Sequence, residues 1–195
     1  MFVAVDPTMN TSEAMLARRA VRSYTSRKVD DATLTTLLRA AVQAPSAMNR
    51  QPWLFAIIQD VAQLKRYSDH AKALLLEHLS GDPKASSYAD RLRSPSFNIF
   101  YDASTLIVIG AAERGTYTDA DCWLAAANLM LAATDSGLGT CPIGFAVPVL
   151  NLPETRAEIG LPPSGVAVAP ILLGYPSAAT PRVPRAEAKV VSWSR

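Results

Sequence analysis

The sequence predicts one domain in which helices flank a β-sheet, an α+β or α/β sandwich. The 195 residues suffice for one sizeable core, and a composition that is 49% apolar and 18% charged excludes a disordered protein. Three short apolar runs, typical of buried strands, alternate with segments whose apolar residues recur at helical spacing. The connections are too uneven for a regular doubly wound sheet, and no repeat or low-complexity linker divides the chain.

The first predicted elements are two helices and a strand. Ser12 is expected to cap a short helix that ends at Arg19, and Asp30 or Asp31 a second helix whose apolar residues share one face. Residues 53–58 (WLFAII) are apolar without alternation, which predicts a strand buried on both faces.

The later elements continue the same alternation. In chain order they are a polar helix at about 61–79, closed by residues 81–83 (GDP), a strand at 105–109, the most apolar helix at about 121–136, a short helix beginning at Pro153 and a strand at 166–173. Because the helix at 121–136 is apolar nearly all round, we expect it to be central and buried. Residues 83–97 are serine-rich and weakly patterned.

The charge and cysteine content exclude several classes of protein. Net charge is +2 with scattered basic residues, so binding of nucleic acid is not expected. Cys122 and Cys141 have no metal-ligand spacing and are expected to be free buried thiols, a single disulfide being the alternative. The first residues lack the pattern of a signal peptide, and the longest apolar helical run, 122–134, is too short to span a bilayer. We therefore expect a soluble, cytoplasmic, single-domain protein over residues 1–195.

Two N-terminal segments are candidates for ligand binding. Residues 18–22 (RRAVR), expected at the end of the first helix, place three guanidiniums together, and an anion such as phosphate would relieve their repulsion; a solvated basic face is the equal alternative. Residues 44–53 (APSAMNRQPW) concentrate hydroxyl and amide groups that suit a planar heterocycle or sugar-like chain. The alternative is a polar turn in which Ser46 or Asn49 bonds its own backbone.

Two C-terminal segments complete the set. Residues 137–145 (GLGTCPIGF) allow close approach of backbone N–H groups to a ligand, or form a helix cap and a turn. Residues 181–185 (PRVPR) add two arginines that would close over the same anion, or form a solubilising tail. His70 and His78 have no paired acid, and no protein nucleophile is evident, which favours an enzyme whose cofactor carries the chemistry.

The order and spacing of these segments resemble the bacterial nitroreductase family. The resemblance rests on residues 18–24 (RRAVRSY), 44–53, 137–144 and 173–176 (LGYP), and covers the chain from about Ser12 to Trp193. It implies an α+β fold with a central, mostly antiparallel sheet, noncovalently bound FMN, and a homodimer with two interfacial active sites. The C-terminal arm, about 177–195, would be exchanged with the partner subunit.

The resemblance also implies a set of cofactor-binding residues. They are Arg18, Arg19, Ala20, Arg22, Pro45, Ser46, Ala47, Asn49, Gln51, Pro142, Ile143, Gly144, Arg182 and Arg185. Arg18 would hold the phosphate, with Arg185 and less directly Arg182. Arg22 would lie near the pyrimidine edge and tune the flavin, and the partner would contribute residues 45–51. No metal is implied.

The implied activity is an NADH- or NADPH-dependent flavin oxidoreductase that reduces nitroaromatic, quinone or similar acceptors by ping-pong hydride transfer. Dehalogenation, flavin cleavage, heterocycle dehydrogenation or flavin binding without turnover are the alternatives. Three departures from the family pattern are Ala20 in place of a serine, Met48 in place of a glycine, and a loop after Cys141 that leaves open which N–H meets flavin N5. Residues 82–101 and 114–118 are expected to determine the acceptor, which the sequence does not name.

Overall fold

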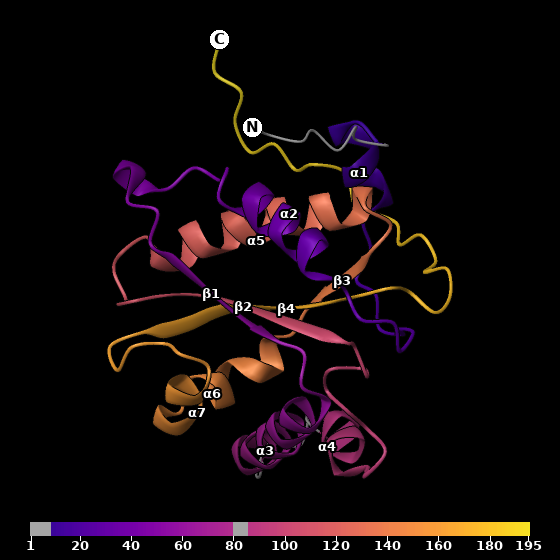
Figure 1. Cartoon of the computed structure of the whole chain (residues 1–195). Helices are drawn as coiled ribbons and strands as arrows, with labels where there is room; N and C mark the ends of the chain where they lie inside the picture. The colour runs from indigo at the N-terminus through magenta and orange to yellow at the C-terminus, as the bar shows by residue number, and fades with distance from the viewer. Residues whose placement is uncertain (1–8, 80–85) are drawn as a thin grey trace.

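The computed structural model describes residues 9–79 and 86–195, which fold as a sheet between two layers of helices (Figure 1). In chain order the elements are α1 (Thr11–Ala17), α2 (Asp31–Ala41), the 3-10 turn η1 (Ala47–Asn49), β1 (Trp53–Ile58), α3 (Val61–Leu79), α4 (Ser86–Arg93), β2 (Thr105–Ala111), α5 (Thr118–Asp135), β3 (Gly139–Pro142), the 3-10 turn η3 (Gly144–Ala146), α6 (Val147–Leu150), α7 (Pro153–Glu158) and β4 (Val166–Gly174). The predicted α+β class is confirmed.

The sheet has the strand order β1-β2-β4-β3, and every pair is antiparallel. The central strands β2 and β4 are buried along their whole length, as their uninterrupted apolar runs predict. The register between them shifts at Ile109 and Gly110. A Cβ at Gly110 would lie 2.3 Å from the carbonyl oxygen of Val166, so this close approach requires glycine.

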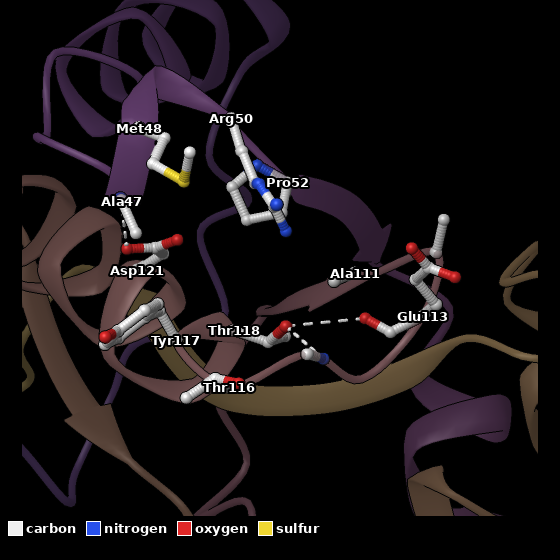
Figure 2. A pocket seen from close by; sticks show the side chains of 12 residues that line it. Ala47, Met48, Arg50, Pro52, Ala111, Glu113, Thr116, Tyr117, Thr118 and Asp121 are labelled. Carbon is white, nitrogen blue, oxygen red and sulfur yellow. Dashed lines mark hydrogen bonds between the residues drawn. The ribbon is translucent and has the colours of Figure 1, made fainter.

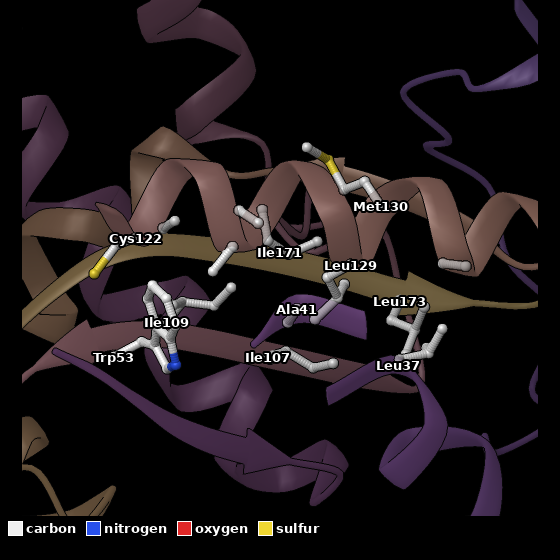
Figure 3. Close-up of a cluster of buried hydrophobic side chains, with 14 of the residues drawn as sticks. Leu37, Ala41, Trp53, Ile107, Ile109, Cys122, Leu129, Met130, Ile171 and Leu173 are labelled. Carbon is white, nitrogen blue, oxygen red and sulfur yellow. The ribbon is translucent and has the colours of Figure 1, made fainter. Parts of the chain in front are cut away.

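Each face of the sheet has its own apolar core. On one face α2 and α5 pack against the sheet through residues such as Leu37, Leu129 and Ile171 (Figure 3). On the other face α3, α4 and α6 contribute Leu64, Leu92 and Val149. Full burial of each such aliphatic side chain stabilises the fold by about 1.5–3 kcal/mol. Helices cover both faces of the sheet, so only its two edge strands, β1 and β3, are left beside which a ligand site could form.

The starts and ends of the first two helices differ slightly from expectation. Asn10, not Ser12, caps α1, because its side chain accepts a bond from Glu13 N (3.0 Å) while the Glu13 carboxylate accepts one from Asn10 N (2.8 Å). The helix ends at Ala17 rather than Arg19. Asp30 caps α2 as predicted, accepting a bond from Thr33 N at 2.8 Å.

The expectation that the most apolar helix is central and buried holds for one of its faces, which packs against the sheet, α1 and α2. α5 begins at Thr118 instead of Asp121, and its side chains are buried along one face only. Trp123 and Leu124 are 40% and 44% exposed. An apolar surface therefore remains uncovered on the outer side of α5 in the single chain.

Several short elements were not predicted, namely β3, α4, α6 and the two 3-10 turns. β3 is only four residues long, and its glycine and proline are poor strand formers, so the sequence pattern indicated a cap and turn instead. α4 lies in the weakly patterned stretch and continues the helical layer beside α3. The predicted end of the polar helix at residues 81–83 lies outside the described residues. None of the helices described is both long and apolar enough to cross a membrane.

Candidate functional site

The arginine segment at residues 18–22 is extended, not helical. Arg18 has left the helix, with ψ of 132°, and Ala20 forms a parallel bridge with Thr140 of β3. The Val21 amide donates a hydrogen bond to the Thr140 carbonyl at 2.9 Å. In an extended segment alternate side chains point to the same side, so Arg18 and Arg22 are separated from Arg19. The helical repulsion inferred from sequence does not apply here.

Arg18 and Arg22 line two cavities that share Pro142. The first, about 380 Å³, is enclosed by Arg18, Met15 and residues of α5 together with Pro142. The second, about 430 Å³ and hereafter the Arg22 cavity, is lined by Arg22 and by residues 141–145. The structure thus brings together Arg18, Arg22 and the predicted glycine loop, although they lie more than a hundred residues apart in the sequence.

The glycines of this loop act in different ways. Gly137 has a φ of +71° and ends α5, with Leu138 N bonded to the Ala133 carbonyl at 2.8 Å. A Cβ at Gly139 would lie 2.7–2.9 Å from three side-chain atoms of Val21, so glycine there admits the arginine segment. A Cβ at Gly144 would meet nothing within 4 Å, which leaves its backbone open to a ligand.

Arg19 points elsewhere. Its Nη1 donates to the carbonyls of Leu16 (2.6 Å) and Arg18 (2.8 Å), which caps the C-terminal end of α1. It lines a separate cavity with Gly139 and the start of the tail, and its buried Nε has no hydrogen-bond partner among the described atoms. The guanidinium of Arg19 is therefore engaged with its own backbone rather than with the Arg22 cavity.

The protein groups beside Arg22 are poor proton donors or nucleophiles. Burial raises the pKa of the Cys141 thiol, and the nearby charges of Arg22 and Arg18 only partly oppose the shift. Burial also raises the pKa of Tyr24, whose hydroxyl donates to the Val21 carbonyl at 2.7 Å. Both cysteines are free and buried, as predicted. The arrangement can bind an anion and a planar group, but nucleophilic chemistry by the protein itself is not supported.

The polar groups of residues 45–51 bond mainly to one another. Ser46 Oγ accepts a hydrogen bond from Gln51 N at 2.9 Å, and Gln51 Nε2 donates to Asn49 Oδ1 at 3.1 Å. Met48, Asn49 and Gln51 all have positive φ angles, between 48° and 55°. These angles lie in the left-handed region of backbone conformation, where a Cβ makes unfavourable contacts with the backbone. Glycine has no Cβ and would adopt the conformation at Met48 with less strain. Met48, which stands where the family pattern has a glycine, therefore has a strained backbone.

A buried carboxylate attaches this loop to α5. Asp121 Oδ1 accepts a hydrogen bond from the Ala47 amide at 3.0 Å, across 74 positions of sequence. Figure 2 shows the cavity beside this contact, about 650 Å³, with Met48 and Arg50 on one side and Tyr117, Thr118 and Glu113 on the other. Residues 115–118, expected to influence the acceptor, thus line a cavity with the loop.

The two groups of predicted residues lie at opposite edges of the sheet. Residues 18–22 pair with β3, one edge strand, whereas residues 45–51 lead into β1, the other. Three strand spacings separate the edges, roughly 14 Å. Within one chain they line different cavities. Arg182 and Arg185 lie in the exposed tail and do not line the cavity that holds Arg18.

Sequence reasoning missed one wall of the Arg22 cavity. Arg91, Leu92, Phe97 and Tyr101 line it from α4 and the segment that follows. They fall in the stretch that we expected to affect the acceptor, but no motif marks them. Tyr101 could not be found from sequence, because its φ of 51° is set by the fold and not by a turn-forming residue type.

Comparison with known proteins agrees with this geometry. A sequence profile described as "Nitroreductase family" matches residues 15–175. The chain is 29% identical over 182 residues to an iodotyrosine deiodinase of Thermotoga neapolitana, covering 87% of this chain and 90% of that protein. It is 27% identical over 187 residues to an NADH dehydrogenase of Thermus thermophilus, covering 88% and 89%.

The fold is also similar to that of a solved nitroreductase structure. The crystal structure of a nitroreductase with bound FMN from Bacteroides fragilis superimposes with a TM-score of 0.81 at 26% identity, covering 96% of this chain and 100% of that one. The profile spans most of the chain, and it includes the end of α1, the arginine segment, the loop at residues 45–51 and β3. The chain belongs to the nitroreductase family.

Proposed function

We propose that this protein is an FMN-dependent oxidoreductase that uses NADH or NADPH to reduce nitroaromatic, quinone or similar electron-poor acceptors. The observation that carries the proposal is the pairing of residues 18–22 with β3, which sets Arg18 and Arg22 on either side of Pro142. The relatives named above, a nitroreductase with FMN and an NADH dehydrogenase, support the same chemistry.

The residues present fit FMN. A phosphate needs cationic, forked donors, which Arg18 supplies. A flavin ring needs an open apolar surface with a cation at its pyrimidine edge, which Pro142, Ile143 and Arg22 supply. The open space beside Gly144 admits a planar ring against the backbone. When bound, FMN would accept a hydride from NADH or NADPH and pass it to the acceptor.

Each residue has a separate role in the proposal. Arg18 binds the phosphate, with Arg185 of the tail as a second cation, and Arg22 stabilises negative charge on the pyrimidine edge. The Ile143 amide already donates to the Pro170 carbonyl at 2.9 Å. Gly144 is therefore the better candidate for the N–H that meets flavin N5, which narrows the choice left by the sequence.

A homodimer would unite the two edges of the sheet. Residues 45–51 cannot reach the Arg22 cavity of their own chain, and a partner subunit would bring its copy to that cavity. The uncovered Trp123 and Leu124 of α5 supply an apolar surface for the contact. Val190, Val191 and Trp193 are exposed in the tail, which supports an arm that packs on the partner.

The first test is the visible spectrum of the purified protein. A yellow protein that loses its visible absorbance on anaerobic addition of NADPH would support the proposal. A colourless protein that FMN cannot reconstitute would refute it. Steady NADPH consumption with a quinone separates an enzyme from a flavin-binding protein without turnover.

Replacing Arg18 tests the phosphate role. We expect Arg18→Ala to weaken FMN binding by about tenfold or more, because a charge-assisted hydrogen bond is lost. Fluorescence titration of apoprotein with FMN measures the change. Riboflavin, which lacks the phosphate, is the control ligand, and its affinity should change little. Equal loss for both ligands would contradict the assignment.

Replacing Arg22 tests the tuning role. Arg22→Ala removes a cation from the edge that gains negative charge on reduction, so the reduction potential should fall by roughly 30 mV. Spectroelectrochemical titration measures it, with Arg22→Lys as the variant that keeps the charge. An unchanged potential in Arg22→Ala would show that Arg22 does not act on the flavin.

Sedimentation tests the dimer. The wild-type chain should sediment as a dimer, and Leu124→Glu on the uncovered face of α5 should shift it to monomer and release FMN. Val61→Glu is the matched control, because Val61 is an exposed apolar residue on α3 in the opposite layer. Monomer with tightly bound FMN would contradict a shared site.

Similarity to an iodotyrosine deiodinase supports a second candidate, reductive dehalogenation of an aromatic compound. Halide release from 3-iodotyrosine under anaerobic conditions, compared with turnover of a nitroaromatic at equal concentration, decides between them. Rapid halide release with slow nitroreduction would favour the dehalogenase.

A further inference from the structure

The wall of the Arg22 cavity formed by α4 and the following segment holds a second arginine. Arg91 and Leu92 come from α4, and Phe97 and Tyr101 from the segment that precedes β2. They face Arg22 and residues 141–145 across a space of about 430 Å³. Among the described residues, the lining holds two guanidiniums and no carboxylate, an arrangement that favours an anionic ligand.

Arg91 is oriented by aromatic rings. Its guanidinium carbon lies 4.4 Å from the centre of the Phe97 ring and 5.7 Å from that of Tyr101. Its Nη2 lies 3.5 Å from the Tyr101 hydroxyl, a long hydrogen bond. Within residues 9–79 and 86–195 it forms no salt bridge, whereas Arg93 on the same helix contacts Asp90. The stacked fork of Arg91 thus keeps donors for another anion.

The aromatic wall is fixed from behind by α3. Lys72, whose side chain is 10% exposed, donates from Nζ to the Phe97 carbonyl at 2.9 Å and the Ser94 carbonyl at 3.3 Å. Ser68 Oγ accepts a hydrogen bond from the Ile99 amide at 3.0 Å. These buried contacts hold the wall in place before a ligand arrives, and a preformed wall loses little conformational freedom on binding.

Tyr101 adds an independent sign of a binding site. Its φ is 51° and that of Asp102 is 55°, a region that costs a bulky residue about 1 kcal/mol or more. The side chain of Asn98 stabilises the turn, because its Nδ2 donates a hydrogen bond to Asp102 Oδ1 at 2.9 Å. The strained turn brings the Tyr101 ring into the cavity lining, and strained residues cluster at ligand sites.

We propose that the acceptor taken by this protein is a planar aromatic acid, with its carboxylate bound by Arg91 and its ring held by Phe97 and Tyr101 on the wall of the Arg22 cavity that faces Pro142 and Ile143. The inference rests on the proposed function, since it names the acceptor class of the same site. Arg18 and Arg22 serve FMN in that proposal, which leaves Arg91 as the unassigned cation of the cavity. An alternative source of the anion is the 2′-phosphate of NADPH, which would enter the same opening.

Two matched acceptors test the proposal. 4-Nitrobenzoate and 4-nitrobenzamide have the same size and differ in charge, so the ratio of their kcat/KM values reports on anion binding. We expect Arg91→Gln to lower that ratio about tenfold and Arg91→Glu to lower it further, with Arg91→Lys retaining part of the preference. Arg93→Gln is the control, because Arg93 is 65% exposed, lies on the same helix and does not line the cavity.

The remaining outcomes are also decisive. An unchanged ratio in Arg91→Gln overturns the proposal, and so does a rise in KM for NADPH but not NADH with the acceptor ratio unaltered. FMN affinity should be the same in Arg91→Gln and wild type. Calorimetric titration with 4-nitrobenzoate needs no turnover: weaker binding to Arg91→Gln than to wild type supports the site even if the protein proves colourless and the proposed function fails. Equal binding refutes the site even if the enzyme is active.

Discussion

The two edges of the sheet carry the two halves of the candidate site, and they are held in contrasting ways. At the β3 edge, residues 18–22 are fixed by a backbone bridge and by Val21 packed on Gly139, and the segment has no positive φ angle. At the β1 edge, residues 45–51 contain three left-handed residues and are tied to α5 by the Asp121 bond.

The half of the site at the β3 edge is therefore already formed in the single chain, whereas the half at the β1 edge has a strained backbone. The β3 edge is assembled from the core outward, so its arginines are positioned by packing. The β1 edge keeps its polar groups bonded to one another and its Met48 side chain 84% exposed. Strain that the fold sustains at an exposed loop is typical of a surface that contacts something else. Substitutions at Gly139, Asp121 and Met48 test whether the two edges differ in this way.

The largest effect is expected at Gly139. In Gly139→Ala the new Cβ would overlap three atoms of the buried Val21 side chain, so the arginine segment must move. We expect a loss of about 2 kcal/mol in the free energy of unfolding, with weaker FMN binding. Urea unfolding measures it, and Gly115→Ala, where a Cβ meets only Thr118 Oγ1 at 3.4 Å, is the control. Equal stability of both variants would mean that the segment is not packed tightly.

An intermediate effect is expected at Asp121. Asp121→Ala leaves the part-buried Ala47 amide without its acceptor and should lower the free energy of unfolding by about 1 kcal/mol, whereas Asp121→Asn keeps an acceptor oxygen and should lower it less. Hydrogen exchange at the Ala47 amide should accelerate in the alanine variant. If exchange there is unchanged, the loop is held by something other than this bond.

The smallest effect, of opposite sign, is expected at Met48. Met48→Gly relieves the left-handed backbone and, after the entropy that glycine adds to the unfolded chain, should raise stability by about 0.5 kcal/mol. Met48→Ala keeps the Cβ and should not gain. Thermal unfolding of the three proteins compares them, and destabilisation by glycine would argue that Met48 makes contacts that its exposure does not suggest.

Much of the fold could be predicted because its cause is local. The runs at β1, β2 and β4 are almost entirely apolar, and Asp30 caps α2 through Thr33. The expected burial of β1 on both faces was wrong, because β1 is an edge strand whose Leu54 and Ile57 are partly exposed. β3 could not, since a strand with Gly139 and Pro142 exists only because β4 offers it an edge. The helical end assigned to Arg18 and Arg19 was wrong for the same reason: pairing with Thr140 keeps the segment extended.

The residues of the candidate site also divide into those that the sequence identified and those that only the fold brings there. Motif spacing identified Arg18, Arg22 and Pro142 as one group, and the structure brings them to adjoining cavities. It could not identify Arg91 and Tyr101, because nothing in their residue types or spacing encodes the stacking and the left-handed turn that bring them there. Roles at the flavin remain predictions for the variants above.

The bridge between Ala20 and Thr140 also bears on how the protein is made. The N-terminal arginines leave the ribosome first, yet β3 needs β4 as its neighbour, so their position is set only after Gly174 has emerged. FMN would then bind completed chains and not nascent ones. At a hundredfold excess over its dissociation constant it would add about 2.7 kcal/mol to their stability.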